Sequence, residues 1–295
     1  GTGLISSELC YGDDAEVRYA GGRRQVRVYS KTSREELLQS PPTGFEMSQG
    51  WYVITGGLGG LGLLSAKVLS ELGARRIALV SRSGRVSYSD QGLESRLEHL
   101  QSLPGVEVVC LQCDVSKEGE VSGLFSKLRG TDVTGSGVHG ISGVVHSAGV
   151  LRDALLRGGS ASAGSVDVWK SKAQSAFWLH KHSSGDDIRL FVCYSSIAAA
   201  LGNIGQSSYA SANRYLEELV LHRNEASVRD GCVCRSASIQ WPAIRGVGMA
   251  AAVATAGEMD IDGVDLSIDD FAFVFRSVVL GCLVSGGVSG GVSCG

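Results

Sequence analysis

The chain has 295 residues, 43% of them hydrophobic, and a mean hydropathy of +0.11, which is enough apolar material for a sizeable core. Its formal net charge of -3 gives no sequence-wide basic field, which argues against nucleic acid or an anionic membrane as partner. No apolar run approaches the roughly 20 residues of a membrane span, and the N-terminus does not read as a secretory signal. We therefore expect a soluble, cytoplasmic protein.

The first segment with a clear pattern, residues 15–30, reads "AEVRYAGGRRQVRVYS". Polar and apolar residues alternate on both sides of a Gly-Gly pair, which predicts a β-hairpin without a core of its own. The following "KTSREELLQSPPTGFEMSQG" predicts a short helix, a Pro-Pro stop and a glycine. We place a boundary there, so that residues 1–46 precede the main domain.

From Trp51 onward, apolar strand patterns alternate with helical patterns. "WYVIT" is followed by a helical segment, "RIALVSR" by another, and the alternation continues to "VCRSASIQW" near residue 241. This order predicts an α/β fold of the Rossmann type, a doubly wound parallel sheet with helices on both faces. In such sheets, ligands bind at the carboxyl ends of the strands, so the residues after each strand are the candidate site.

A glycine-rich stretch, "VITGGLGGLG" at residues 53–62, joins the first of these strands to a helix. Glycines permit a tight turn and an unobstructed backbone, and the N-H groups at the start of the helix can receive a pyrophosphate. The alternative is a turn that serves close packing alone. The predicted cofactor contacts here are Thr55, Gly56, Gly57, Leu58, Gly59, Gly60, Leu61 and Gly62.

The second strand ends in "LVSRSG", with Ser81, Arg82 and Ser83 where an NAD-binding domain places a carboxylate. A guanidinium and a hydroxyl suit the 2'-phosphate of NADPH, so we expect NADPH as the cofactor. The alternative is that Arg82 is a solvated surface arginine.

Two further strand ends complete the predicted cofactor site. Asp114 and Val115 follow the third strand, where an adenine would lie, and "HSAG" follows the fourth. Its small residues would let the backbone approach the nicotinamide ribose, whereas His146 reads as a buried core histidine. The predicted contacts in "HSAG" are Ser147, Ala148 and Gly149.

Eight cysteines raise the question of a zinc site or disulfides. Cys110 and Cys113 lie in a strand pattern, and residues three apart on a strand point to opposite faces. We therefore predict free thiols and no metal.

The fifth strand ends in Ser196, and Tyr209 follows 13 residues later with Asn213 one helical turn beyond it. Alone, a serine at a strand end and a tyrosine on a helix read as scaffolding. Together with the glycine motif, they resemble the short-chain dehydrogenase/reductases. That family normally has a lysine at the position of Asn213, and the exchange is similar to that in the ketoreductase domains of polyketide and fatty acid synthases.

The resemblance to these ketoreductases covers about residues 10–280, through "TGGLGGLG", "HSAGVLRDALL", "FVCYSSIAAALGNIGQSSYASANRYLEEL" and "SIQWPAIRGVGM" in the same order. It implies that the lysine comes from "KSKAQSAFWLH", as Lys172 rather than Lys170. It also implies NADPH-dependent reduction of a β-ketoacyl group on an acyl carrier protein. Tyr209 would then donate the proton, Ser196 would bind the carbonyl, Lys172 would favour ionisation of the tyrosine, and Asn213 would orient the lysine or a water.

The resemblance also implies a division of the chain. Residues 1–46 would be the remnant of a structural subdomain, residues 47–285 the catalytic domain with a lid at about 242–266, and residues 286–295 a loose glycine-rich tail. Neighbouring synthase domains would be further partners. The alternatives are a catalytically silent scaffold domain of a synthase and a stand-alone reductase of small carbonyl compounds.

Stereochemical subtypes of these ketoreductases differ near the site. One carries Trp where this chain has Leu201, and the other carries Leu-Asp-Asp where this chain reads Leu151-Arg152-Asp153. The retained Asp153 favours the second subtype, the B-type, which gives a D-configured alcohol. The residues assigned to substrate binding and stereocontrol by this resemblance are Asp153, Leu201, Gln206, Trp241 and Met249.

Overall fold

The computed structural model describes residues 17–20, 23–26, 47, 50–87, 91–130, 140–155, 161–229, 235–249, 265–284 and 292–293. Contacts divide the chain into two units, Gly1–Glu36 with Gly295, and Leu37–Cys294. The described part of the first unit is an antiparallel hairpin of β1 (Val17–Ala20) and β2 (Arg23–Val26), in which Val17 pairs with Val26. This confirms the predicted hairpin, whereas the helix predicted after it lies outside the described residues.

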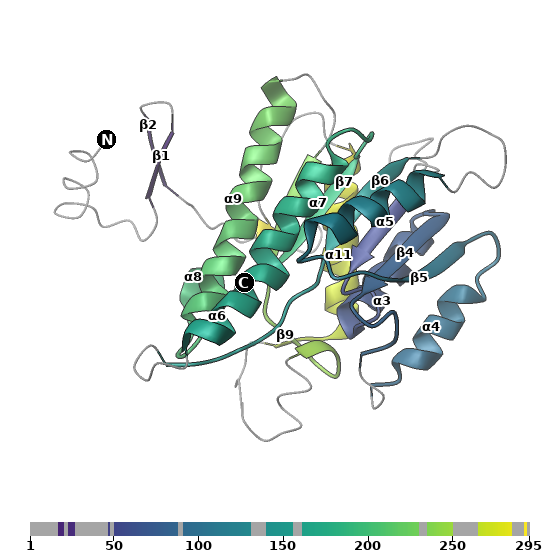
Figure 1. Ribbon diagram of the computed structural model, residues 1–295, viewed down its shortest axis with the longest axis horizontal. Helices are drawn as coiled ribbons and strands as arrows, with labels where there is room; N and C mark the ends of the chain where they lie inside the picture. Colours follow the sequence, from purple (N-terminus) through teal and green to yellow (C-terminus); the bar gives the residue numbers. More distant parts are fainter. Residues whose placement is uncertain are drawn as a thin grey trace. The chain divides into compact units, whose positions relative to one another are not determined.

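The second unit is built on a parallel sheet of seven described strands in the order β11-β8-β7-β6-β3-β4-β5 (Figure 1). The first strand of this sheet along the chain, β3, lies near its middle. The chain then runs outward through β4 to β5 and returns to β6, which lies on the other side of β3. The order therefore reverses between β3 and β6, as in a doubly wound Rossmann sheet. The strands are β3 (Trp51–Thr55), β4 (Arg76–Ser81), β5 (Glu107–Gln112), β6 (Ile141–His146), β7 (Leu190–Ser196), β8 (Arg235–Trp241) and β11 (Val292–Ser293).

Helices cover both faces of this sheet, and the central strands β3 and β6 are therefore buried along their whole length. One apolar core holds α3, α4 and α11 against the sheet, and a second core holds α5, α7 and α9 against the opposite face (Figure 1). The helices are α3 (Gly60–Glu71), α4 (Leu93–Gln101), α5 (Glu118–Gly130), α6 (Ala161–Trp169), α7 (Ser175–Ser183), α8 (Ala198–Leu201), α9 (Ser207–Arg229) and α11 (Ile268–Val284), with a π-helix η1 (Lys170–Gln174) between α6 and α7.

The C-terminal segment differs from its prediction. Residues 286–295 were predicted as a loose tail, but Val292 and Ser293 pair with Ile239 and Gln240 of β8 as the short edge strand β11. Strand β8 would otherwise leave backbone groups unpaired on that side, and the β-branched Val292 suits a strand.

The region of the predicted lid is described only at its ends. A short parallel pair, β9 (Ala243–Ile244) and β10 (Asp265–Leu266), brings these ends together. Residues 250–264, which make up most of the predicted lid, lie outside the described residues. Among the helices that the structure describes, none is both long and apolar enough to cross a membrane.

Candidate functional site

The glycine turn after β3 is packed too tightly for side chains. Gly56 has a φ of +66°, in the left-handed region that favours glycine. A Cβ on Gly62 would lie 2.4 Å from the carbonyl oxygen of Gly56, and one on Gly57 would lie 2.5 Å from that of Ile54. The turn therefore needs glycine at these positions, which supports the prediction that its backbone is free of side chains and can approach a ligand.

The start of α3 fits a negatively charged group. Its N-cap residue is Gly59, and no side chain of the described residues caps the first turn. Free N-H groups and the helix dipole at such an end attract a phosphate. The donor set and the cradle that side chains would fill thus fit the pyrophosphate of a dinucleotide.

The end of β3 is tied to the end of β6, on the opposite side of the point where the strand order reverses. The Ser147 hydroxyl donates to the Thr55 carbonyl at 2.7 Å, and the Ala148 N-H donates to the Thr55 hydroxyl at 3.4 Å. A Cβ on Gly56 would lie 2.9 Å from the Ala148 nitrogen. The predicted cofactor residues after β3 and β6 are therefore brought together.

The residues after β4 and β5 differ in what occupies them. Arg82 is exposed, and no ion pair is found for it among the described residues, so its guanidinium is accessible to a ligand. Asp114 instead accepts hydrogen bonds from the N-H and hydroxyl of Ser116, at 3.1 and 2.7 Å. Its carboxylate therefore stabilises the turn before α5, while Val115 is buried beside it.

Lys172 projects into the same end of the sheet from the π-helix η1. It is 3% exposed, whereas Lys170 lies on the exposed side of η1. Its Nζ donates to the Tyr194 carbonyl at 2.9 Å and lies 5.2 Å from the centroid of the Tyr209 ring. An ammonium group is thereby held between the end of β7 and the tyrosine of α9.

Ser196 and Tyr209 offer their hydroxyl groups at this place. Ser196 Oγ accepts a hydrogen bond from the Ala198 N-H at 3.2 Å, and in the described part of the chain its proton is donated to no neighbour. Tyr209 is half-buried in the first turn of α9. Asn213 lies directly beneath it and donates through Nδ2 to the Tyr209 carbonyl at 3.0 Å.

The amide oxygen of Asn213 is a buried acceptor in this set. Asn213 is fully buried, and among the described residues its Oδ1 has no hydrogen-bond partner. Buried acceptors without a partner are uncommon, so this oxygen is available to a water, a ligand or a nearby donor. The structure thus brings Lys172, Tyr209, Asn213 and the end of β7 into one cluster.

Comparison with known proteins identifies the family. A family model described as "KR domain" matches residues 50–246. Mellein synthase of Phaeosphaeria nodorum is 33% identical over 266 residues, and a 6-methylsalicylic acid synthase of Arthrobotrys oligospora is 34% identical over 268 residues. The matches cover 84% and 88% of this chain but only 14% of each relative. The chain belongs to the ketoreductase domain family of polyketide synthases.

Solved structures agree with this assignment. "Structure of A1-type ketoreductase" superposes with a TM-score of 0.73 and 25% identity over 95% of this chain and 54% of that chain. A ketoreductase domain from the bacillaene assembly line gives 0.71 and 25% identity over 94% of this chain and 63% of that chain. A short-chain dehydrogenase/reductase from Mycobacterium ulcerans, at 19% identity and a TM-score of 0.59 over 77% of this chain and 82% of that chain, shares the fold.

A buried carboxylate supports the end of the sheet that holds the candidate site, and the sequence analysis missed it. Glu217 accepts hydrogen bonds from the Ser195 hydroxyl and the Gln240 amide, each at 2.7 Å, and from Arg214 at 2.9 Å. It thereby ties α9 to the ends of β7 and β8. The available signal was the four-residue spacing of Tyr209, Asn213 and Glu217, which places all three on one face of a helix.

The predicted stereocontrol residues fall into two groups. Gln206 donates to the Asp153 carboxylate at 2.9 Å, and the Ala154 N-H donates to the Gly205 carbonyl at 2.9 Å. The segment after β6 is thus tied to the loop between Ser196 and Tyr209, where Leu201 is 79% exposed. Trp241 lies apart from this group, because its indole packs in the core against Tyr194 and Phe271.

The start of the predicted lid rests on the glycine turn. Val247 Cβ and the Gly248 nitrogen lie 2.8 and 2.9 Å from where a Cβ on Gly60 would be. Gln91 pairs with the backbone of Gly248, accepting from its N-H at 3.1 Å. Met249 follows these contacts directly, so the hinge region and the predicted cofactor site are in contact.

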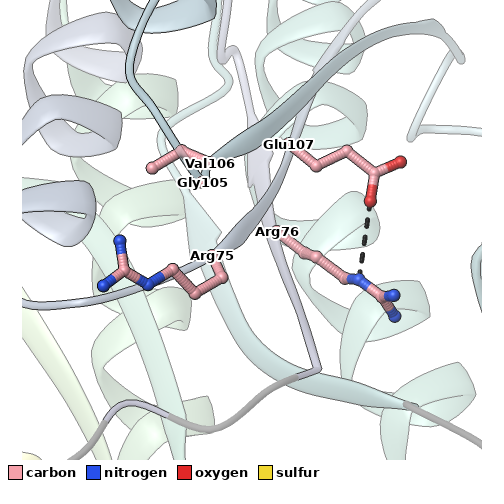
Figure 2. A pocket seen from close by; sticks show the side chains of 5 residues that line it. All are labelled: Arg75, Arg76, Gly105, Val106 and Glu107. Carbon is pink, nitrogen blue, oxygen red and sulfur yellow. Dashed lines mark ion pairs between the residues drawn. The ribbon is translucent and has the colours of Figure 1, made fainter. Parts of the chain in front are cut away.

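A separate surface pocket of about 350 Å³ lies far along the strands, at the amino ends of β4 and β5 (Figure 2). Figure 2 shows Arg76 turned toward Glu107, to which its Nε lies 3.5 Å away, and Arg75 extending in the other direction. Because the candidate site is at the carboxyl ends of the strands, this pocket is not part of it. Its lining residues are Arg75, Arg76, Gly105, Val106 and Glu107.

Proposed function

We propose that this domain reduces a β-ketoacyl thioester, carried on the phosphopantetheine arm of an acyl carrier protein, to the β-hydroxyacyl thioester with NADPH. The observation that carries the proposal is the buried ammonium of Lys172. It lies 2.9 Å from the Tyr194 carbonyl and 5.2 Å from the centre of the Tyr209 ring, beside the glycine turn. A lysine, a tyrosine and a serine converging next to a dinucleotide cradle suit carbonyl reduction.

Reduction of a ketone places growing negative charge on the carbonyl oxygen. Ser196 would donate its free hydroxyl proton in a hydrogen bond to this oxygen and orient the carbonyl, while Tyr209 would transfer its proton to it. NADPH supplies the hydride when it is bound. Both hydroxyl groups come from elements whose relative position is fixed by Glu217.

Lys172 and Asn213 assist the tyrosine. The ammonium of Lys172 favours the phenolate that remains after proton transfer, because opposite charges attract strongly where water is excluded. It could also bind the nicotinamide ribose. The free Oδ1 of Asn213 is an acceptor for a lysine proton or for a water that returns a proton to Tyr209.

The choice of cofactor rests on Arg82. Its exposed guanidinium follows β4, where a carboxylate would select the ribose hydroxyl of NADH. Paired N-H donors bind a phosphate in a two-point contact, which supports NADPH.

We assign residues 47–285 to the catalytic domain and the carrier protein and neighbouring synthase domains to its partners. The chain spans 14% of the length of the first two synthases that it matches, so these partners rest on analogy with larger proteins. We assign a D-configured product on the residues alone, since Asp153 is kept and Leu201 stands where the other subtype has Trp. Two of the similar solved structures are described as A-type ketoreductases, so product analysis is needed.

The test is to mix the protein with NADPH and a β-ketoacyl thioester, to follow cofactor absorbance, and to analyse the product on a chiral column. Wild type should consume NADPH, and Tyr209→Phe should lower kcat by about 10² or more, because proton donors contribute this much. The matched control is Tyr215→Phe on the same helix, which should keep its activity because Tyr215 packs against Trp169 instead. An L-configured product would contradict the stereochemical assignment.

An idle wild type that still binds NADPH would contradict the proposal and favour a silent scaffold domain. Equal loss of activity in the Tyr209 and Tyr215 variants would also count against it, since the hydroxyl of Tyr209 would then have no special role.

A further inference from the structure

His146 occupies the junction between the cofactor strand and the helix that carries Lys172. It is the last residue of β6, and its side chain is fully buried. Its Nδ1 lies 2.7 Å from the Thr55 hydroxyl oxygen, and its Nε2 lies 3.0 Å from the Lys172 carbonyl oxygen. The sequence alone indicated a core histidine, but these contacts connect it to two elements of the site.

The partners of the ring define its protonation. A carbonyl oxygen can only accept, so Nε2 must carry a proton and donate it to Lys172. Burial, followed by the charge of Lys172, lowers the pKa of His146 to about 3, so the ring is neutral at ordinary pH. Nδ1 is then an acceptor, and the Thr55 hydroxyl donates to it.

The carbonyl that receives this bond belongs to an irregular turn. In η1 the Ser175 N-H reaches back five residues to the Lys170 carbonyl and also contacts the Lys172 carbonyl. A π-turn accommodates one extra residue, and such turns are frequent at functional sites. The Ser175 hydroxyl lies 3.1 Å from the Lys172 carbonyl and 3.2 Å from His146 Nε2, but its shortest bond, at 2.6 Å, goes to the Ser171 carbonyl. The Nε2-H of His146 is therefore the main side-chain donor to the Lys172 carbonyl, and it stabilises the turn at the residue whose side chain enters the site.

The lysine is held along its whole length. His146 bonds its carbonyl, and Tyr194 accepts from its ammonium at 2.9 Å. Gly149 lies against its stem, because a Cβ there would be 2.8 Å from Lys172 Cε. The contacts with Tyr194 and Gly149 restrict the Lys172 side chain, and the contact with His146 fixes its backbone.

We propose that His146 is a positioning residue for Lys172. The Nε2-H of His146 fixes the π-turn, and the turn holds the Lys172 ammonium beside the Tyr209 ring. This role rests on the proposed reductase function. It requires no proton transfer by the ring. It assigns to the histidine of "HSAG" a specific donor, Nε2, and a specific acceptor, the Lys172 carbonyl.

The test uses two amides that each reproduce one ring nitrogen. In His146→Gln the side-chain nitrogen can take the place of Nε2 and donate to the Lys172 carbonyl, whereas in His146→Asn the shorter amide reaches only the place of Nδ1, near Thr55. Both variants replace the ring by an uncharged amide, and the Asn side chain is one methylene shorter than that of Gln. We expect kcat to fall by about tenfold or more in the Asn variant relative to the Gln variant, since small misplacements of catalytic groups have such effects.

Two further measurements and a replacement variant make the result decisive. The NADPH dissociation constant and the thermal midpoint of each variant separate loss of kcat from loss of cofactor binding or of folding. If the Asn variant does not fold, His146→Met replaces it, because Met is close to Gln in length, suits an apolar interior and has no donor. The Met variant should then show the loss that Gln avoids.

Equal kcat in the Gln variant and in the variant without the donor would overturn the positioning role, because the ring would then only fill space. A wild type that reduces no β-ketoacyl thioester would instead overturn the proposed function. The two failures are therefore distinguishable.

Discussion

The two ends of the parallel sheet differ in what they hold. At the amino ends of β4 and β5 there is a hollow of about 350 Å³, but Arg76 is turned toward Glu107 at 3.5 Å and stacked 5.9 Å from the centre of the Trp51 ring. At the carboxyl ends, glycine backbone, a buried lysine and two hydroxyl groups converge. The amino end thus has a pocket but no cluster of candidate catalytic groups. The carboxyl end has such a cluster, beside a closely packed glycine turn.

The difference follows from the direction of the chain. In a parallel sheet all strands point the same way, and each following helix begins at the carboxyl end with its free N-H groups directed there. Loops at that end can therefore present donors to a ligand, as α3 does without a side-chain cap. Substitutions at the carboxyl end should alter catalysis or cofactor binding, and those at the amino end should alter neither.

The largest effect is expected at Lys172. Lys172→Met keeps the length of the stem but removes the ammonium between the Tyr194 carbonyl and Tyr209, and kcat should fall by about 10² or more. Steady-state kinetics measures this, with Lys170→Met on the exposed side of η1 as the matched control. A comparable loss in both variants would break the distinction between the two lysines.

The next effect is expected at the glycine turn. In Gly62→Ala the new methyl group would lie 2.4 Å from the Gly56 carbonyl oxygen, so the turn must shift. NADPH affinity should fall by about tenfold or more, measured by fluorescence titration, because the phosphate cradle is displaced. Gly123→Ala is the control, since no described residue lies within 4 Å of a Cβ there. Unchanged affinity in Gly62→Ala would remove the turn from the cofactor site.

A selectivity change is expected at Arg82. Arg82→Ala removes the paired donors proposed for the 2'-phosphate, so the ratio of kcat/KM for NADPH to that for NADH should fall by about tenfold. Arg85→Ala, also exposed in the same loop, is the control. The prediction fails if the ratio is the same in both variants.

Acid stability should depend on His146. Its pKa is about 3 in the folded protein and about 6.5 in an unfolded chain, so between these values the unfolded state binds a proton that the folded state does not. Stability should therefore fall as pH drops below 6.5, by up to about 1.4 kcal/mol per pH unit from this group. His146→Gln should flatten the slope in denaturant titrations. His180, with a pKa lowered to about 4 by burial and by Arg223, keeps part of the slope.

The smallest effect is expected at the amino end. Arg76→Met should change the free energy of unfolding by about 1 kcal/mol or less, because the Glu107 side chain of this ion pair is 47% exposed and solvent screens the pair, and kcat should not change. Chemical denaturation and the same kinetic assay measure both. A large loss of kcat would show that this hollow takes part in the reaction.

The fold was largely predictable because local patterns and global topology agree. Strand β3 at Trp51–Thr55 and the glycine turn were recognised from apolar runs and breaker residues. Strand β11 was not, because two residues in a glycine-rich segment carry no periodic signal, and their pairing depends on the unpaired edge of β8.

The residues proposed for the candidate site came from the sequence, but their geometry could not. Periodicity cannot choose between Lys170 and Lys172, since the extra residue of η1 changes the phase of the helix, and the choice came from a resemblance. The contacts of His146 and Glu217 join elements far apart in sequence. Such contacts follow from tertiary packing, which no local pattern encodes.

The contact between Gly60 and the Val247-Gly248 backbone has a consequence for engineering. Because these atoms leave no room for a side chain on Gly60, the segment after β8 cannot be exchanged independently of the glycine turn. If the segment after β8 is replaced by that of a relative with another substrate, the replacement should begin after Gly248. The hydrogen bond between Gln91 and the Gly248 backbone would then be kept, and it would hold the first residue of the new segment in its native position.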